Sequence, residues 1–155
     1  MARITRKSVG KSEQYLSHRE TAKELGEGAD CAVRAVSVAC SRPYEEVLEV
    51  MTRMGRKPRG ATETAVIRDT IISMGYNPAN LEWKGISDKI ESYPGNHKNK
   101  KYVTTHQPDR FPEVWKDGKT YLFFVRGHVL CVKDGVNHDW TRGRSLKVFM
   151  IWEIK

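Results

Sequence analysis

The sequence lacks three features that would assign it to well-defined protein classes. No apolar run approaches the roughly 18–20 residues of a membrane-spanning helix, and the longest is Tyr121–Val125. Three cysteines are too few and too scattered for a disulfide framework. No internal repeat, low-complexity tract or Pro/Gly-rich linker is visible. These absences argue against a membrane protein, a disulfide-stapled domain and a repeat protein.

The first eleven residues are basic but lack the apolar middle of a secretion signal. An odd number of cysteines without such a signal indicates a reducing compartment with free thiols. We therefore expect a cytoplasmic protein with no membrane partner.

The chain has 155 residues, and its 27 Lys+Arg against 19 Asp+Glu give a net charge of +8. This length suits one domain, which we expect over residues 15–155, preceded by a flexible basic arm over residues 1–14. The positive charge favours an acidic protein or peptide partner, or non-specific nucleic-acid binding. No helix-turn-helix, zinc finger or other nucleic-acid-reading motif accompanies it.

Helix signals fill the first half of the domain. Asp30 is a good N-cap for a buried helix over residues 31–40, which is apolar on nearly every side. A second helix follows Pro43, with Val47, Leu48, Val50, Met51 and Met54 on its apolar face, and stops at Gly55. Thr62 is expected to cap a third, with Ala65, Val66, Ile67, Ile71 and Met74 inward, that ends at Gly75.

The second half is predicted to be β-structure after an irregular segment. A short helix near residues 87–92 and a strand over residues 102–105 are expected first, and then strands over residues 120–125, 128–133, 136–141 and 146–154. Asp134-Gly135 predicts a tight hairpin turn. Helices followed by strands indicate an α+β fold with an antiparallel sheet.

Cys31 is the cysteine whose position in the sequence favours a reactive thiol. Cys31 is expected as the first residue of its helix, where the dipole and free N–H groups favour the thiolate. A two-residue turn at Asp134-Gly135 would pair Val132 with Asn137 and leave His128 and Asp139 as diagonal neighbours on one face. A thiolate, a base and a carboxylate that orients the base are the parts of nucleophilic catalysis.

These motifs resemble the papain-like cysteine peptidases. The residues that carry the likeness are Asp30-Cys31-Ala-Val-Arg34 at a helix start, Gly127-His128-Val-Leu-Cys-Val-Lys-Asp-Gly135, and Val136-Asn-His-Asp139-Trp140. The likeness covers residues 27–154 in element order and is nearest to small bacteriophage proteins of this fold. It implies Cys31 as nucleophile, His128 as base and Asp139 as the group that orients His128.

The chain departs from that family at the oxyanion hole. Many members place a glutamine a few residues before the cysteine, but the only glutamines here are Gln14 and Gln107. The backbone N–H of Cys31 is a candidate for one donor, and Gln14, Ser17 and His18 are candidates for the second. The loss of one such donor costs roughly 10²–10³ in rate.

The sequence thus predicts a cysteine hydrolase that attacks a peptide, isopeptide or amide carbonyl, in the host cytoplasm if a phage encodes it. The same residues also serve acyl transfer and deamidation. Two alternatives stay open, namely a weakly active or inactive papain-like scaffold that binds or inhibits a protein, and a basic nucleic-acid-binding protein. The cysteines and histidines lack zinc-ligand spacing, so no metal or cofactor is expected.

Overall fold

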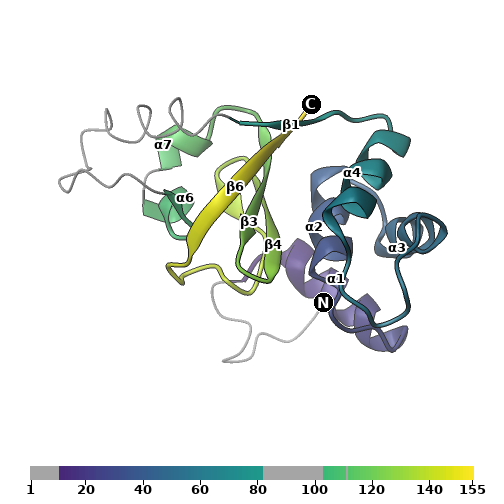
Figure 1. The fold of residues 1–155 in the computed structure, drawn as a ribbon. Helices are drawn as coiled ribbons and strands as arrows, with labels where there is room; N and C mark the ends of the chain where they lie inside the picture. Colours follow the sequence, from purple (N-terminus) through teal and green to yellow (C-terminus); the bar gives the residue numbers. More distant parts are fainter. Residues whose placement is uncertain (1–10, 82–102, 111) are drawn as a thin grey trace.

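The computed structural model describes residues 11–81, 103–110 and 112–155, and in it helices precede a β-sheet (Figure 1). The helices are α1 (Glu13–Glu24), α2 (Cys31–Ala39), α3 (Tyr44–Arg53), α4 (Thr64–Ser73), α6 (Gln107–Arg110) and α7 (Pro112–Trp115). The strands are β1 (Pro78–Asn80), β2 (Val103–Thr104), β3 (Thr120–Val125), β4 (His128–Lys133), β5 (Val136–Asn137) and β6 (Lys147–Ile154). None of the helices in these described ranges has the length and apolarity needed to cross a bilayer.

The strands form one antiparallel sheet in the order β1-β6-β3-β4-β5, with β2 also paired to β6. The α+β prediction with an antiparallel sheet is therefore confirmed. β3 lies between β6 and β4, and every residue of it after Thr120 is buried. This burial explains why Tyr121–Val125 is an unbroken apolar run, since both faces of the strand are covered.

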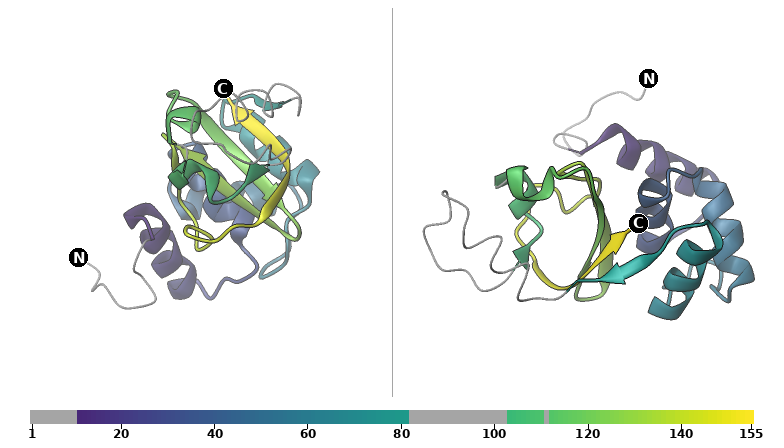
Figure 2. Two further views of the ribbon diagram at one scale, coloured as in Figure 1. Left: turned by 90° about the vertical axis from the view of Figure 1, so that its left-hand side faces the viewer. Right: turned by 90° about the horizontal axis from the view of Figure 1, so that it is seen from above.

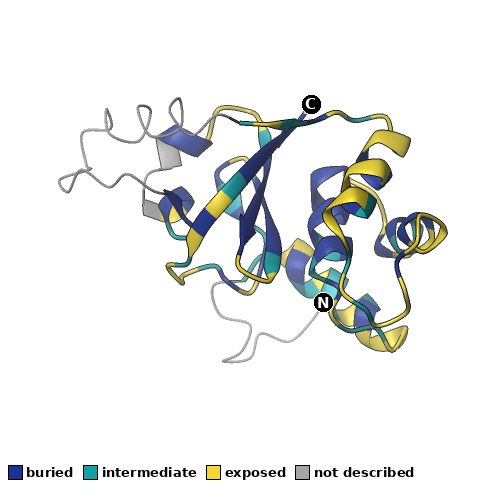
Figure 3. Cartoon of the chain, viewed as in Figure 1, coloured by how far each residue is buried: buried dark blue, intermediate teal, exposed yellow. Residues whose placement is uncertain are grey.

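The sheet is covered on both faces, with α1–α4 on one side and α6 and α7 on the other (Figure 2). Alternate side chains of β3 enter two cores. Leu122 and Phe124 pack towards α2, α3 and α4. Tyr121 and Phe123 instead pack against Trp115 of α7. In Figure 3 the central strands of the sheet and helix α2, which packs against them, are mostly coloured as buried.

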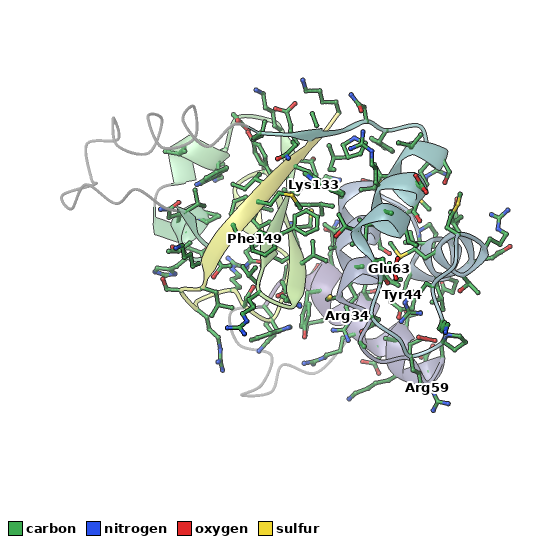
Figure 4. All side chains as sticks on the ribbon, viewed as in Figure 1. Arg34, Tyr44, Arg59, Glu63, Lys133 and Phe149 are labelled. Atoms are coloured by element: carbon green, nitrogen blue, oxygen red, sulfur yellow. The ribbon has the colours of Figure 1, made fainter. Side chains whose placement is uncertain are left out.

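Helix α2 is the central helix of the larger core and packs along β4. Every residue of α2 is buried except Cys31 and Arg34, as its apolar sequence predicts. Lys133 at the end of β4 fixes the other end of α2, because its Nζ donates to Val38 O and Ser41 Oγ (Figure 4). The start of α2 is thereby held at a fixed position relative to the start of β4.

Helix α1 was not expected from the sequence, which predicted the first element only after Gly26. The helix begins at Glu13, inside the segment expected as a flexible arm, and residues 1–10 lie outside the described residues. Ser12 caps it by accepting from the Tyr15 N–H at 3.1 Å. Only Tyr15 and Ala22 of its twelve residues are buried, so the apolar periodicity that reveals most helices is absent.

The hairpin of β4 and β5 has the predicted turn, but its second strand is shorter than predicted. β3 and β4 have the predicted bounds, and the turn residues Asp134 and Gly135 have φ of 53° and 73°, as a type I′ turn requires. The register pairs Val132 with Asn137 as expected. The returning strand ends at Asn137 instead of Thr141, because the residues after it turn back on themselves.

A few predicted core residues and element boundaries differ slightly from those in the structure. Met54 is 41% exposed and Ala65 is also exposed, so neither belongs to the core. Glu63, and not Thr62, is the N-cap of α4. β2 begins at Val103 and β6 at Lys147; the helix expected near residues 87–92 lies outside the described residues.

Candidate active site

The structure brings Cys31, His128 and Asp139 together, from the start of α2, the start of β4 and the turn after β5. Cys31 is half-buried at the first position of α2, and the first helical bond runs from Arg34 N to Asp30 O at 3.1 Å. The His128 ring and the Val129 backbone N–H both act on the sulfur and favour its thiolate form. The remaining cysteines, Cys40 and Cys131, are buried in the core.

His128 is fixed by the carboxylate predicted to orient it. Its Nε2 lies 2.7 Å from Asp139 Oδ2, and the two side chains are only 14% and 6% exposed. With Nε2 engaged by Asp139, Nδ1 is the ring nitrogen left for the thiol of Cys31. The imidazole is thus bound to the carboxylate on one side and interacts with the sulfur on the other, the arrangement needed for a base that is itself held in place.

Asp139 is in turn held by Thr141, a residue that the sequence reasoning did not single out. Both the backbone N–H and the hydroxyl of Thr141 donate to Asp139 Oδ2, at 3.1 Å and 2.8 Å. Asn137 Nδ2 donates to Thr141 Oγ1 at 3.0 Å, and Asn137 and Thr141 are both fully buried. Asp139 lies beyond the end of β5 and is not paired in the sheet. The turn after β5 holds its carboxylate in place instead.

The environment of Cys31 and His128 favours the thiolate–imidazolium pair. Burial raises the pKa of Cys31, but the hydrogen bonds from His128 and the Val129 N–H outweigh burial and lower it overall. Burial lowers the pKa of His128, while hydrogen bonds to Asp139 and Cys31 raise it to about 9. At neutral pH the imidazole is thus protonated beside the sulfur, which is the state that activates a cysteine.

A second polar cluster anchors Asp30, the residue before Cys31. The Asp30 side chain makes no cap bond, contrary to expectation, and instead accepts from Arg34 Nε and Nη2 at 3.0 and 2.9 Å. The Tyr44 hydroxyl donates to Asp30 Oδ2 at 2.7 Å, and Arg34 Nη1 reaches the Tyr15 hydroxyl at 3.4 Å. Arg34 and Tyr44 lie close together in Figure 4. The network ties the start of α2 to α1 and α3.

The loop before α2 is fixed from the other side by Arg56. Arg56 is 3% exposed, although it lies in a loop between α3 and α4. Its Nη1 lies 3.0 Å from Glu27 Oε1 and its Nη2 donates to Gly28 O at 3.2 Å. An arginine between two loops is buried here because Glu27 compensates its charge.

The second oxyanion donor stays unassigned. Gln14 and Ser17 are exposed on α1, and the His18 ring lies 6.2 Å from that of Tyr44. Among the described residues, the hydrogen bonds and charges that act on Cys31 come from His128, Val129 and Asp139. Gln107, in α6, is buried. The backbone N–H of Cys31, at the open end of α2, is the donor that the geometry supplies.

Comparison of the chain with protein-family models, curated protein sequences and solved structures gives no significant match. Within the described ranges, no group of three His, Cys, Asp or Glu side chains is arranged to hold a metal ion. The geometry around Cys31 is therefore the basis on which a function can be inferred.

We expect Thr141→Val to weaken the site without removing any of its three central residues. The change deletes the hydroxyl that donates to Asp139 and leaves the buried Asn137 amide without its acceptor. Alkylation of Cys31 by iodoacetamide at neutral pH should slow by about three- to tenfold, and stability should fall by about 1–3 kcal/mol. Stopped-flow labelling and urea unfolding measure the two effects.

Thr141→Ser is the control for this prediction, because it keeps the hydroxyl and should retain most of the labelling rate. Equal labelling rates for Thr141→Val and the wild type would contradict the role of Thr141.

Proposed function

We propose that this protein is a cysteine hydrolase that attacks a peptide, isopeptide or amide carbonyl through Cys31. The observation that carries the proposal is the placement of Cys31, at a helix start, with His128, whose ring binds Asp139 at 2.7 Å. The pKa of the thiol is lowered and that of the imidazole is raised to about 9. Such coupled shifts in opposite directions are typical of an activated nucleophile and its acid–base partner.

The first half of the reaction uses the ion pair directly. The Cys31 thiolate attacks the carbonyl carbon, a C–S bond forms, and the oxyanion lies at the N-terminus of α2, where N–H groups stabilise negative charge. His128, protonated, then gives the Nδ1 proton to the leaving nitrogen as the C–N bond breaks. An amine departs and a thioester on Cys31 remains.

The second half regenerates the enzyme. His128, now neutral, accepts a proton from water, which attacks the thioester carbonyl and releases a carboxylic acid and the Cys31 thiolate. Asp139 keeps the imidazole in one orientation through both halves, because its Oδ2 binds Nε2 throughout. An amine in place of water would give acyl transfer by the same steps, and a substrate glutamine side chain would give deamidation.

The papain-like resemblance supports this proposal through the order of its parts: a nucleophile helix, further helices, and a sheet that bears His128 and Asp139. We extend the proposal to a cytoplasmic protein, in the host cytoplasm if a phage encodes it. The net charge of +8 favours an acidic protein or peptide as the substrate.

Acyl-enzyme formation tests the reaction without knowledge of the natural substrate. We expect p-nitrophenyl acetate to give a burst of p-nitrophenol equal to the enzyme concentration, and peptide mapping to find the acetyl group on Cys31. Hydroxylamine should remove it, as it removes thioesters. Cys40→Ala is the matched control and should keep the burst, whereas Cys31→Ala should lose it.

The outcome also separates the enzyme from a binding scaffold. Acylation elsewhere in the chain, or none under conditions in which Cys31 is a reactive thiolate, would reject the hydrolase. The same site would then belong to an inactive scaffold, in agreement with the unassigned second oxyanion donor. A positive result leads to proteome-wide substrate trapping with the Cys31→Ala variant.

A further inference from the structure

Next to His128, an exposed aromatic ring extends the candidate site towards solvent. Trp140 follows Asp139 directly, is 39% exposed, and its ring centroid lies 5.3 Å from that of His128 with the planes tilted by 48°. Exposed tryptophan beside a buried polar pair is unusual in a soluble domain, since this side chain is normally well covered. It presents an apolar surface to whatever approaches the imidazole.

Arg144 lies over this ring. Its guanidinium carbon is 5.6 Å from the Trp140 ring centroid, and its side chain is exposed. Four of the described arginines have carboxylate partners: Arg34 has Asp30, Arg42 has Glu46, Arg56 has Glu27 and Arg142 has Asp109. Within the described ranges no carboxylate forms an ion pair with Arg144, so its charge is available to a ligand.

The backbone of Arg144 is held even though its side chain is exposed. Its N–H donates to Thr141 O at 2.8 Å, and its carbonyl accepts from the Thr105 hydroxyl. Thr105 Oγ1 also accepts from Leu146 N at 3.0 Å. Gly143, with φ of 86°, permits the turn between Thr141 and Arg144. The position of the guanidinium is therefore limited to the reach of one side chain from a fixed point.

The reaction geometry says which part of a substrate meets this pair. His128 must deliver its proton to the leaving nitrogen, so the leaving half of the substrate lies on the imidazole side of the scissile bond. Trp140 and Arg144 extend outward from that same imidazole. Arginine binds carboxylates in a planar two-point geometry and keeps its charge at every physiological pH.

We propose that Arg144, stacked on Trp140, selects substrates that carry a carboxylate in the leaving half, within a few residues of the scissile bond. The inference rests on the proposed hydrolase. The carboxylate is that of an Asp or Glu side chain or of a free chain end, which have the same chemistry. Arg126, exposed two residues before His128, adds positive charge near this site.

Three chloroacetyl dipeptides test the inference, because the chloromethyl carbon reacts with Cys31 while the dipeptide extends as a leaving half would. One carries a glutamate side chain and a C-terminal amide, one a glutamine with a free C-terminal carboxylate, and one a glutamine amide without charge. We expect one or both charged probes to label Cys31 about two- to fivefold faster than the neutral probe at low salt, the range of an exposed ion pair. Added salt should reduce the ratio.

Substitutions assign the preference to one side chain. Arg144→Gln should bring the ratio to about one and Arg144→Glu should invert it, while Arg144→Lys keeps the charge and should keep part of the preference. Arg53→Gln is the control for net charge, because it removes one positive charge from the last turn of α3. It should leave the ratio unchanged.

The possible outcomes separate this inference from the function on which it rests. Equal rates for the three probes on an activated Cys31, or a preference that survives Arg144→Gln, would overturn the role of Arg144 and leave the hydrolase intact. If Cys31 reacts with every probe no faster than in the denatured chain, the hydrolase itself fails, and this inference with it.

Discussion

Iodoacetamide is expected to alkylate Cys31 about 10–100 times faster than an ordinary thiol at about pH 6.5, and His128→Gln is expected to remove most of that advantage. The thiolate is the reacting form, and the structure lowers the pKa of Cys31 through hydrogen bonds from His128 and the Val129 N–H that outweigh burial. His128→Gln takes away the ring and its positive charge but keeps a polar side chain. The pH dependence of the labelling rate, followed by mass spectrometry of the Cys31 peptide, measures the shift.

The two other cysteines supply internal controls for this experiment. Burial raises the pKa of Cys40 to about 11 and raises that of Cys131 as well. Both should stay unlabelled in the native protein and react only after unfolding. Labelling of Cys31 at the rate found in the denatured chain would refute the activated thiolate, and with it the proposed hydrolase.

From the pKa shifts of Cys31 and His128 we expect different pH profiles for alkylation of Cys31 and for substrate hydrolysis. The lowered pKa of Cys31 sets the acid limb of both, because the thiolate is lost as the pH falls through it. His128, with a pKa raised to about 9, holds its proton below that pH and loses it above. Hydrolysis needs this proton for the leaving amine and should decline above about pH 9, whereas alkylation needs only the thiolate and should stay on its plateau.

Where local signals decide the fold, the sequence predicts it well. The bounds of β3 and β4 and the turn between them follow from an apolar run, a tight Asp134-Gly135 turn and alternation around it. Helix α2 follows from the apolar stretch after Asp30. Two elements differ from the prediction. Helix α1 begins at a local cap, Ser12, but has no visible apolar face, and β5 stops early at a turn in which Thr141 binds Asp139.

The candidate site divides in the same way. Cys31 and His128 could be placed from the sequence because each lies at the start of an element with clear local signals. Asp139 was expected on the same face as His128 from a strand register, but β5 ends at Asn137, and the turn that follows it brings Asp139 to His128 instead. The residues that support these three could not be placed from the sequence. Tyr44 contacts Asp30 across 14 residues of sequence, and Thr141 acts only because the strand ends before it. Such contacts depend on packing and leave no periodic signal.

Asp30→Asn is expected to destabilise the protein by about 2–3 kcal/mol at neutral pH, because it breaks an ion pair at a buried carboxylate. Asp30 is 3% exposed, accepts two hydrogen bonds from Arg34 and one from Tyr44, and directly precedes Cys31. Urea unfolding measures the loss. Tyr44→Phe, which removes one of the three donors, should cost about 1 kcal/mol. Glu46→Gln breaks the exposed pair with Arg42 and should change stability by less than about 0.5 kcal/mol.

The pH dependence of this loss identifies its electrostatic origin. Burial raises the pKa of Asp30, but hydrogen bonds from Arg34 and Tyr44 lower it overall below 3.8. A carboxyl whose pKa is lowered by folding stabilises the native state above its ordinary pKa, and this contribution disappears as the pH falls through the lowered value. The stability gap between wild type and Asp30→Asn should therefore be constant from neutral pH to about pH 4 and narrow below it. If the stability difference between the two proteins is the same at every pH, the loss comes from packing alone. The charge of Asp30 would then not help to fix the start of α2.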